Sequence, residues 1–196
     1  MRRIAIVSAV VASALALQAG RAGAQVFTPT YMGPRPASDF GVYVADFGDL
    51  AIEGIWRRIS RGGDIGLRAG YADLGDGALL LGIEVRNPVT LAGSPIGLAF
   101  TAGAQGVLGD ETALGGQVGF TAGQAIPTPN VVITPYIHPR LAVANRFITD
   151  AEDDEFGLEV LADLGVDLDF TNGIVFRVGA NLGAGADWGV GISWRQ

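Results

Sequence analysis

Residues 187–196 read DWGVGISWRQ, and their side chains alternate in character from one position to the next. Trp188, Val190, Ile192 and Trp194 form one apolar row, while the positions between them are small or polar. Such strict alternation over a short run predicts a β-strand with two different environments on its two faces. A tryptophan at each end of the apolar row is typical of a strand that crosses a membrane and places an aromatic ring at each interface.

The composition agrees with strands and turns rather than helices. The chain has 30 glycines, and glycine costs about 1 kcal/mol at a helix-interior position. Only 17% of its residues are charged and none is lysine, the usual residue for keeping exposed strands soluble. There is no cysteine, which excludes disulfides, thiolate metal sites, cysteine nucleophiles and lipid-attachment cysteines.

The chain is predicted to contain one domain preceded by an export signal. Residues 1–24 combine two arginines, an apolar run and a small-residue cleavage site, which indicates a cleaved secretory signal peptide; a retained anchor or a twin-arginine signal is the alternative. Residues 25–37 predict an extended N-terminal segment, and residues 38–196 the domain. No later run reaches the roughly 18 apolar residues of a spanning helix, so any later crossing must use strands. The acidic net charge of −7 argues against a nucleic-acid partner.

Ten strand-length runs follow one another with short turns rich in Gly, Asp and Asn. In the longest example, every second residue from Phe156 to Phe170 is apolar. Hairpin turns make neighbouring strands antiparallel, and closing such a meander removes its two open edges. We therefore expect an all-β, antiparallel up-and-down transmembrane barrel of 8 to 10 strands, with ten favoured. The runs are 39–47, 50–59, 64–73, 77–87, 96–106, 112–123, 131–147, 155–169, 173–183 and 186–195.

Glycine indicates which face lies inside. In the seven runs that alternate cleanly, every glycine except Gly116 lies on the face opposite the large apolar residues. A water-exposed face would carry Thr, Ser, Lys and Glu instead, whereas a narrow lumen needs small residues beside a few large charged ones. We expect these charges to pair in the lumen or to be hydrated, because an unpaired buried charge costs several kcal/mol. The predicted lumen charge cluster is Arg68, Glu84, Arg86, Glu159, Asp163, Asp167 and Arg177.

The chain resembles the small bacterial outer-membrane barrels of the OmpA transmembrane domain, OmpX and OmpW over about residues 38–196. The most specific likeness is the C-terminal assembly signal, matched here by Asp187, Gly189, Ile192 and Trp194. The resemblance implies insertion into outer-membrane lipid by the barrel assembly machinery, with both termini in the periplasm, and we expect a monomer. The chain departs from the pattern by continuing past the final aromatic residue, and its longer connections at 87–95 and 123–130 would be periplasmic.

Little in the sequence indicates catalysis. His138 could serve a hydrolase similar to outer-membrane lipid deacylases, but a histidine at the interface or in the lumen is the simpler interpretation. The acidic run 150–155 lacks the spacing of a calcium loop. We predict no enzyme activity, no metal and no cofactor. The predicted function is an integral outer-membrane barrel with a structural or narrow-pore role, and the alternative is a secreted, soluble calycin-like barrel that encloses a small apolar ligand.

Overall fold

The structure, a computed structural model, describes residues 29–46, 50–73, 77–109, 112–147, 155–182 and 186–196. The predicted signal peptide and residues 150–154 of the acidic run lie outside these ranges. The described residues are strands, turns and irregular segments, and they include no helix able to span a membrane.

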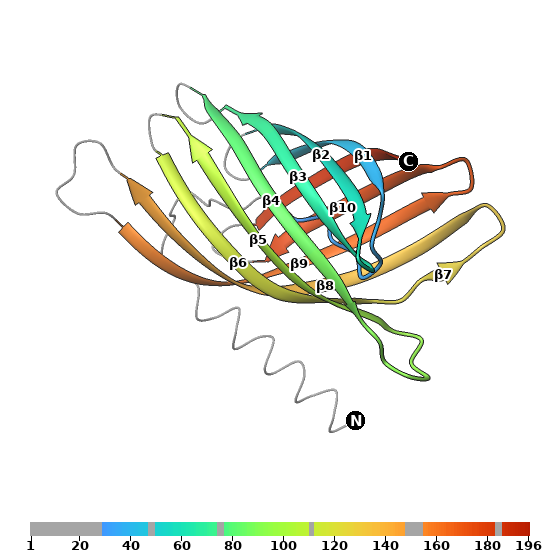
Figure 1. The fold of residues 1–196 in the computed structure, drawn as a ribbon. Helices are drawn as coiled ribbons and strands as arrows, with labels where there is room; N and C mark the ends of the chain where they lie inside the picture. Colours follow the sequence, from blue (N-terminus) through green and yellow to red (C-terminus); the bar gives the residue numbers. More distant parts are fainter. Residues whose placement is uncertain (1–28, 47–49, 74–76, 110–111, 148–154, 183–185) are drawn as a thin grey trace.

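The strands form one antiparallel barrel, in which each wall strand pairs with the wall strands that precede and follow it in the sequence (Figure 1). Ten strands make the wall, and β7 is a two-residue addition that pairs only with β8. The predicted ten-strand up-and-down barrel is therefore confirmed. The strands are β1 (Asp39–Asp46), β2 (Leu50–Ser60), β3 (Gly63–Ala72), β4 (Ala78–Val89), β5 (Gly97–Leu108), β6 (Thr112–Gly123), β7 (Ile126–Pro127), β8 (Val131–Phe147), β9 (Glu155–Phe170), β10 (Ile174–Leu182) and β11 (Ala186–Arg195).

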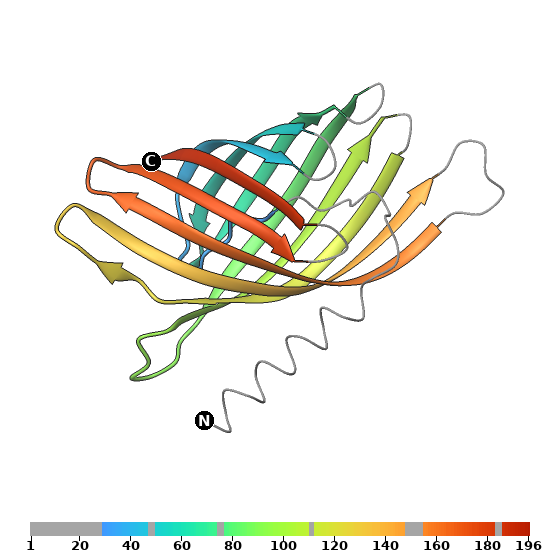
Figure 2. The same cartoon turned by 180° about the vertical axis from the view of Figure 1, so that it is seen from behind.

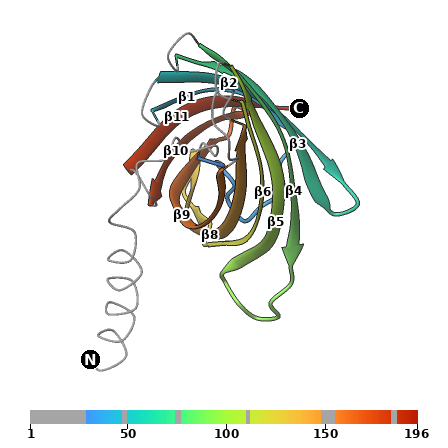
Figure 3. The ribbon, with the colours of Figure 1, turned by 90° about the vertical axis from the view of Figure 1, so that its left-hand side faces the viewer.

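The barrel closes where the last strand pairs with the first. β11 runs antiparallel to β1 along the whole length of β1, from Asp39 opposite Arg195 to Asp46 opposite Trp188. Figures 2 and 3 show these two strands side by side, so no free sheet edge remains at the seam. The residues just outside the seam also join, because the Gln196 amide donates to the Ser38 carbonyl at 2.9 Å.

Successive wall strands run in opposite directions between the two ends of the barrel. We call the end that holds Ser38 and Gln196 the termini end, and the opposite one the far end. The tight turn between β2 and β3 lies at the termini end, with positive φ at both Arg61 (51°) and Gly62 (86°). This conformation belongs to the type I′ turn, whose twist matches that of a hairpin.

The large apolar side chains point outward and the small or charged ones inward. Burial alternates accordingly along the strands, for example from exposed Leu79 to buried Leu80 in β4. At the termini end, Trp194, Phe40 and Trp56 are neighbours across three strands on the outer surface. Every strand of the wall contributes to the exposed apolar surface, including Val42, Ile52, Leu67, Ile83, Phe100, Phe120, Leu141, Leu164, Val178 and Val190.

Candidate functional site

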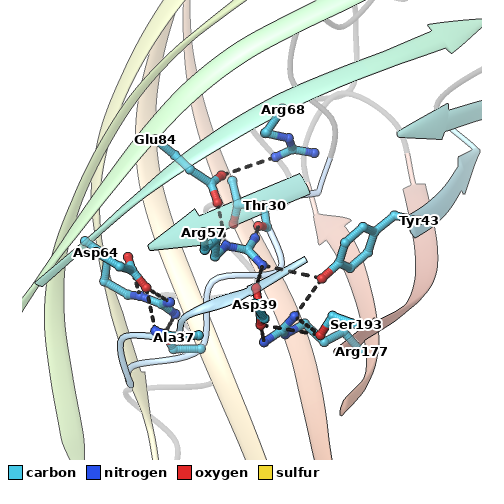
Figure 4. A network of polar contacts seen from close by, with 12 residues as sticks. Thr30, Ala37, Asp39, Tyr43, Arg57, Asp64, Arg68, Glu84, Arg177 and Ser193 are labelled. Atoms are coloured by element: carbon cyan, nitrogen blue, oxygen red, sulfur yellow. Dashed lines mark hydrogen bonds and ion pairs between the residues drawn. The ribbon is translucent and has the colours of Figure 1, made fainter. Parts of the chain in front are cut away.

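The lumen near the termini end contains a network of buried ion pairs. Arg57 donates through Nε to Glu84 Oε1 at 2.8 Å, and Arg68 reaches the other oxygen of Glu84 at 3.5 Å (Figure 4). Arg68 also pairs with Glu53, so three strands are connected through these side chains. All four residues are at most 5% exposed. Such pairs hold their geometry because breaking one would leave an uncompensated buried charge.

A second cluster connects strands on both sides of the barrel seam. Arg177 of β10 donates to Asp39 of β1 at 2.6 Å and to Ser193 of β11 at 2.7 Å. The same guanidinium donates to the Tyr43 hydroxyl at 2.6 Å, and its Nε lies 3.6 Å from Asp167 Oδ2. Arg177 therefore binds side chains from three other strands, β1, β9 and β11, and connects both sides of the closing pair.

Two further acids, Asp64 and Asp163, also pair with arginines in the lumen. Arg86 pairs with Asp64 of the neighbouring strand. On the opposite wall, Arg140 donates to Asp163 Oδ1 at 2.9 Å, while His138 Nδ1 lies 3.2 Å from Oδ2 of the same carboxylate. Among the described residues, no group of three or more His, Asp or Glu side chains could hold a metal ion.

His138 connects a hydroxyl to a carboxylate. Its Nε2 lies 2.7 Å from Thr101 Oγ1, and its Nδ1 faces Asp163, which is the arrangement that a hydrolase uses to activate a nucleophile. All three side chains are at most 3% exposed, and none lines the cavity at the termini end. The arrangement is therefore buried inside the protein. His138 lies in the lumen, which agrees with its interpretation as an interface or lumen histidine.

The N-terminal segment, residues 29–38, lies inside the barrel. It belongs to no strand, and the blue trace passes within the ring of strands in Figure 3. Three arginines of the wall donate to its backbone carbonyls: Arg68 to Pro29 at 3.0 Å, Arg57 to Thr30 at 3.1 Å, and Arg86 to Gly33. The segment is thereby fixed to the ion-pair network.

The side chain of Thr30 and the backbone amide of Ala37 add further contacts between the N-terminal segment and the wall. The Thr30 hydroxyl lies 2.8 Å from Asp163 Oδ2 and 2.8 Å from His138 Nδ1. Nearer the termini end, the Ala37 amide donates to Asp64 Oδ2 at 2.7 Å. The segment is thus bound both deep in the lumen and at its mouth.

Tyr31 occupies a notch lined by glycine. Its ring stacks on Tyr43 with 4.5 Å between centroids, and both rings pack with Ile55. A Cβ at Gly189 would collide with the Tyr31 hydroxyl, and one at Gly179 would lie 3.4 Å from the ring. The inward glycines of β10 and β11 therefore provide the space that this tyrosine fills.

Toward the far end of the lumen, buried apolar residues form a cluster. Leu80 and Leu161, each 1% exposed, meet there with small residues from β2 to β9. Both leucines interrupt the polar pattern of their strands, and their packing explains that interruption. The cluster comprises Ala51, Ala72, Ala78, Leu80, Val107, Ala113, Ala142 and Leu161.

A cavity of about 270 Å³ remains at the termini end. Residues 33–38 form part of its lining, with Asp167, Arg177 and Arg195 among the remaining residues. It includes no residue of the apolar cluster, so the observed cavity does not extend along the lumen to the far end.

Six of the seven residues in the predicted lumen charge cluster make ion pairs in this lumen. The exception is Glu159, a half-buried residue for which the described part of the chain provides no ion pair. Gly189, Ile192 and Trp194 of the predicted assembly signal lie in β11, as does the backbone of Asp187.

Sequence reasoning missed the contribution of the first two strands. Asp39, Tyr43, Glu53 and Arg57 all point into the lumen and belong to the network. The alternation in residues 39–46 indicates that Asp39 and Tyr43 point inward, since both lie on the face opposite Phe40. In β2, inward Ile55 interrupts the polar face and hides the pattern.

No family model and no curated protein matches the chain. Among solved structures the chain is similar to a "KdgM porin", with a TM-score of 0.43 and 5% sequence identity over 81% of this chain and 99% of that one.

Proposed function

We propose that this protein is an integral outer-membrane β-barrel with a structural role, whose lumen is closed in the conformation described. The observation that carries the proposal is the exposed apolar surface on every strand of the wall, combined with a charged interior. A soluble barrel would reverse this arrangement, because water favours charged residues outside and apolar residues inside.

The same observation weighs against the soluble calycin-like alternative. That alternative needs the Leu, Ile, Val and Phe face to surround a ligand, whereas these side chains are exposed. The inward apolar residues at the far end pack on one another instead. The buried state of His138 and Thr101 likewise favours a protein without enzyme activity.

The structural role is favoured over a narrow pore by the contents of the lumen. The N-terminal segment lies in the half of the lumen nearer the termini end, which we call the polar half, and the apolar cluster lies toward the far end. An apolar constriction of this kind opposes ion passage because water does not wet it. In this proposal, residues 1–24 are removed on export, and the assembly machinery inserts a monomer through the signal at Asp187, Gly189, Ile192 and Trp194.

Purification and fractionation test the proposal. We expect the mature protein to fractionate with the outer membrane, to require detergent for a monodisperse state, and to migrate differently on a gel before and after heating. A monodisperse protein without detergent that carries a bound apolar ligand would reject the membrane assignment in favour of the calycin-like one.

A further inference from the structure

We propose that the polar half of the lumen is a binding site for an extended polypeptide whose inner part is uncharged, and that residues 29–38 are its exchangeable occupant. The inference goes beyond the structural role proposed above, and it rests on how the N-terminal segment is held. The three arginine contacts at Pro29, Thr30 and Gly33 all go to backbone carbonyls, which every polypeptide carries.

The charges of the lumen favour an occupant whose inner part is uncharged. Arg57, Arg68 and Arg86, which donate to the segment, are already paired with the carboxylates of Glu84, Glu53 and Asp64. Their remaining N–H groups therefore face the lumen as donors with most of their charge compensated. A neutral carbonyl oxygen fits such donors better than a free anion, whose charge would meet the same carboxylates. The inner part of the segment, residues 29–34, contains no charged residue.

The site also selects one side chain. Tyr31 stacks on Tyr43 and fills the notch at Gly179 and Gly189, so an aromatic residue at this position adds contacts that the arginine N–H donors cannot provide. Thr30 adds a hydroxyl contact to Asp163. The expected ligand is therefore an extended peptide with a tyrosine one position after the residue that meets Arg57.

The manner of attachment makes exchange feasible. The N-terminal segment contributes no strand to the sheet, so its removal breaks none of the strand pairings that close the barrel. The Tyr31 hydroxyl is buried without a hydrogen-bond partner among the described residues. A buried hydroxyl without a partner is unfavourable, so the segment and its site are not fully matched.

The test separates the segment from the barrel without deleting it. Arg35 is exposed at the mouth, so a protease recognition sequence inserted between Arg35 and Pro36 allows cleavage of the folded protein in detergent micelles. A fluorescent peptide with the sequence of residues 25–35 is then added in excess. We expect saturable uptake by a barrel that keeps its folded gel mobility, and at least tenfold weaker binding of the same peptide with Tyr31→Ala.

Two controls make the result specific. Gly189→Val fills the Tyr31 notch and should abolish uptake, whereas Gly157→Val, at an inward position with nothing within 4 Å of an added Cβ, should leave it unchanged. The proposal is overturned if no labelled peptide enters, if a scrambled peptide binds equally well, or if cleavage unfolds the barrel. The detergent requirement is measured separately, so failure here leaves the membrane assignment standing.

Discussion

At the scale of single residues, inward glycines and large side chains fit together. The ring of Tyr43 lies against Gly191, and that of Tyr136 lies against Gly165, in the same way that Tyr31 occupies the space at Gly189. A wider side chain at any of these glycines must displace an aromatic ring. Glycine in this barrel is therefore a packing requirement of the opposite residue, in addition to a turn former.

A cysteine probe tests this relation at Gly189. The chain has no cysteine, so Met32→Cys introduces a single thiol next to Tyr31, at a position that is 1% exposed. We expect a maleimide reagent to label this thiol slowly in the otherwise unchanged protein and at least tenfold faster when Gly189→Val displaces Tyr31. Gly157→Val is the matched control, and equal labelling rates in all three proteins would contradict the proposed packing.

Arg177 is predicted to be the arginine on which the barrel seam depends. Arg177→Met leaves Asp39 buried with less compensation, and removal of one partner of a buried pair costs about 3–5 kcal/mol. The control is Arg195→Met, because Arg195 is 57% exposed and its pair with Asp169 contributes less than about 1 kcal/mol. Urea titration in lipid vesicles, followed by gel mobility, measures both free energies of unfolding. Equal losses of unfolding free energy for the two variants would show that the seam does not depend on Arg177.

At the scale of elements, the strands could be predicted closely and the N-terminal segment could not. The alternation in residues 155–169 and 173–183 predicts β9 and β10 to within one residue at each end, because one face meets the lumen and the other does not. Residues 29–38 have no periodicity, and their main partners are arginines that bind backbone carbonyls. No residue type marks such a contact, so the sequence carries no pattern that places this segment inside.

The two residues that follow Trp194 make backbone hydrogen bonds of their own. The Arg195 amide donates to the Gly173 carbonyl at 2.9 Å, and the Gln196 amide donates to Ser38 at the same distance. These residues therefore extend the seam beyond the predicted assembly signal.

Shortening the last strand should separate stability from assembly. Deletion of Arg195 and Gln196 removes two backbone hydrogen bonds, each worth about 1 kcal/mol, so we expect a lower urea midpoint with an unchanged yield of membrane-inserted protein. Trp194→Ala keeps those bonds but removes the aromatic residue of the predicted signal, and it should lower the yield in cells. Fractionation and urea titration of both variants measure the two effects, and a normal yield of Trp194→Ala would reject the signal.

At the scale of the whole molecule, the proposed closed state of the lumen has two barriers of different chemistry. The N-terminal segment occupies the polar half through hydrogen bonds, and Leu80 and Leu161 occupy the far half through apolar packing. Because the two barriers lie in series, an ion must pass both, and removal of one leaves the other in place.

Planar-bilayer recordings test this arrangement. We expect the unmodified protein to show no stepwise conductance, and deletion of residues 25–37 to leave it silent, because the apolar cluster still excludes water. Leu80→Ala with Leu161→Ala should also remain silent, since the N-terminal segment still fills the polar half. Only the protein that combines the deletion with both substitutions is expected to conduct, and gel mobility before heating verifies that each variant is folded. Steps from the deletion alone would show that the N-terminal segment is the sole barrier and that the narrow-pore role is correct, because its withdrawal would then suffice to open the barrel.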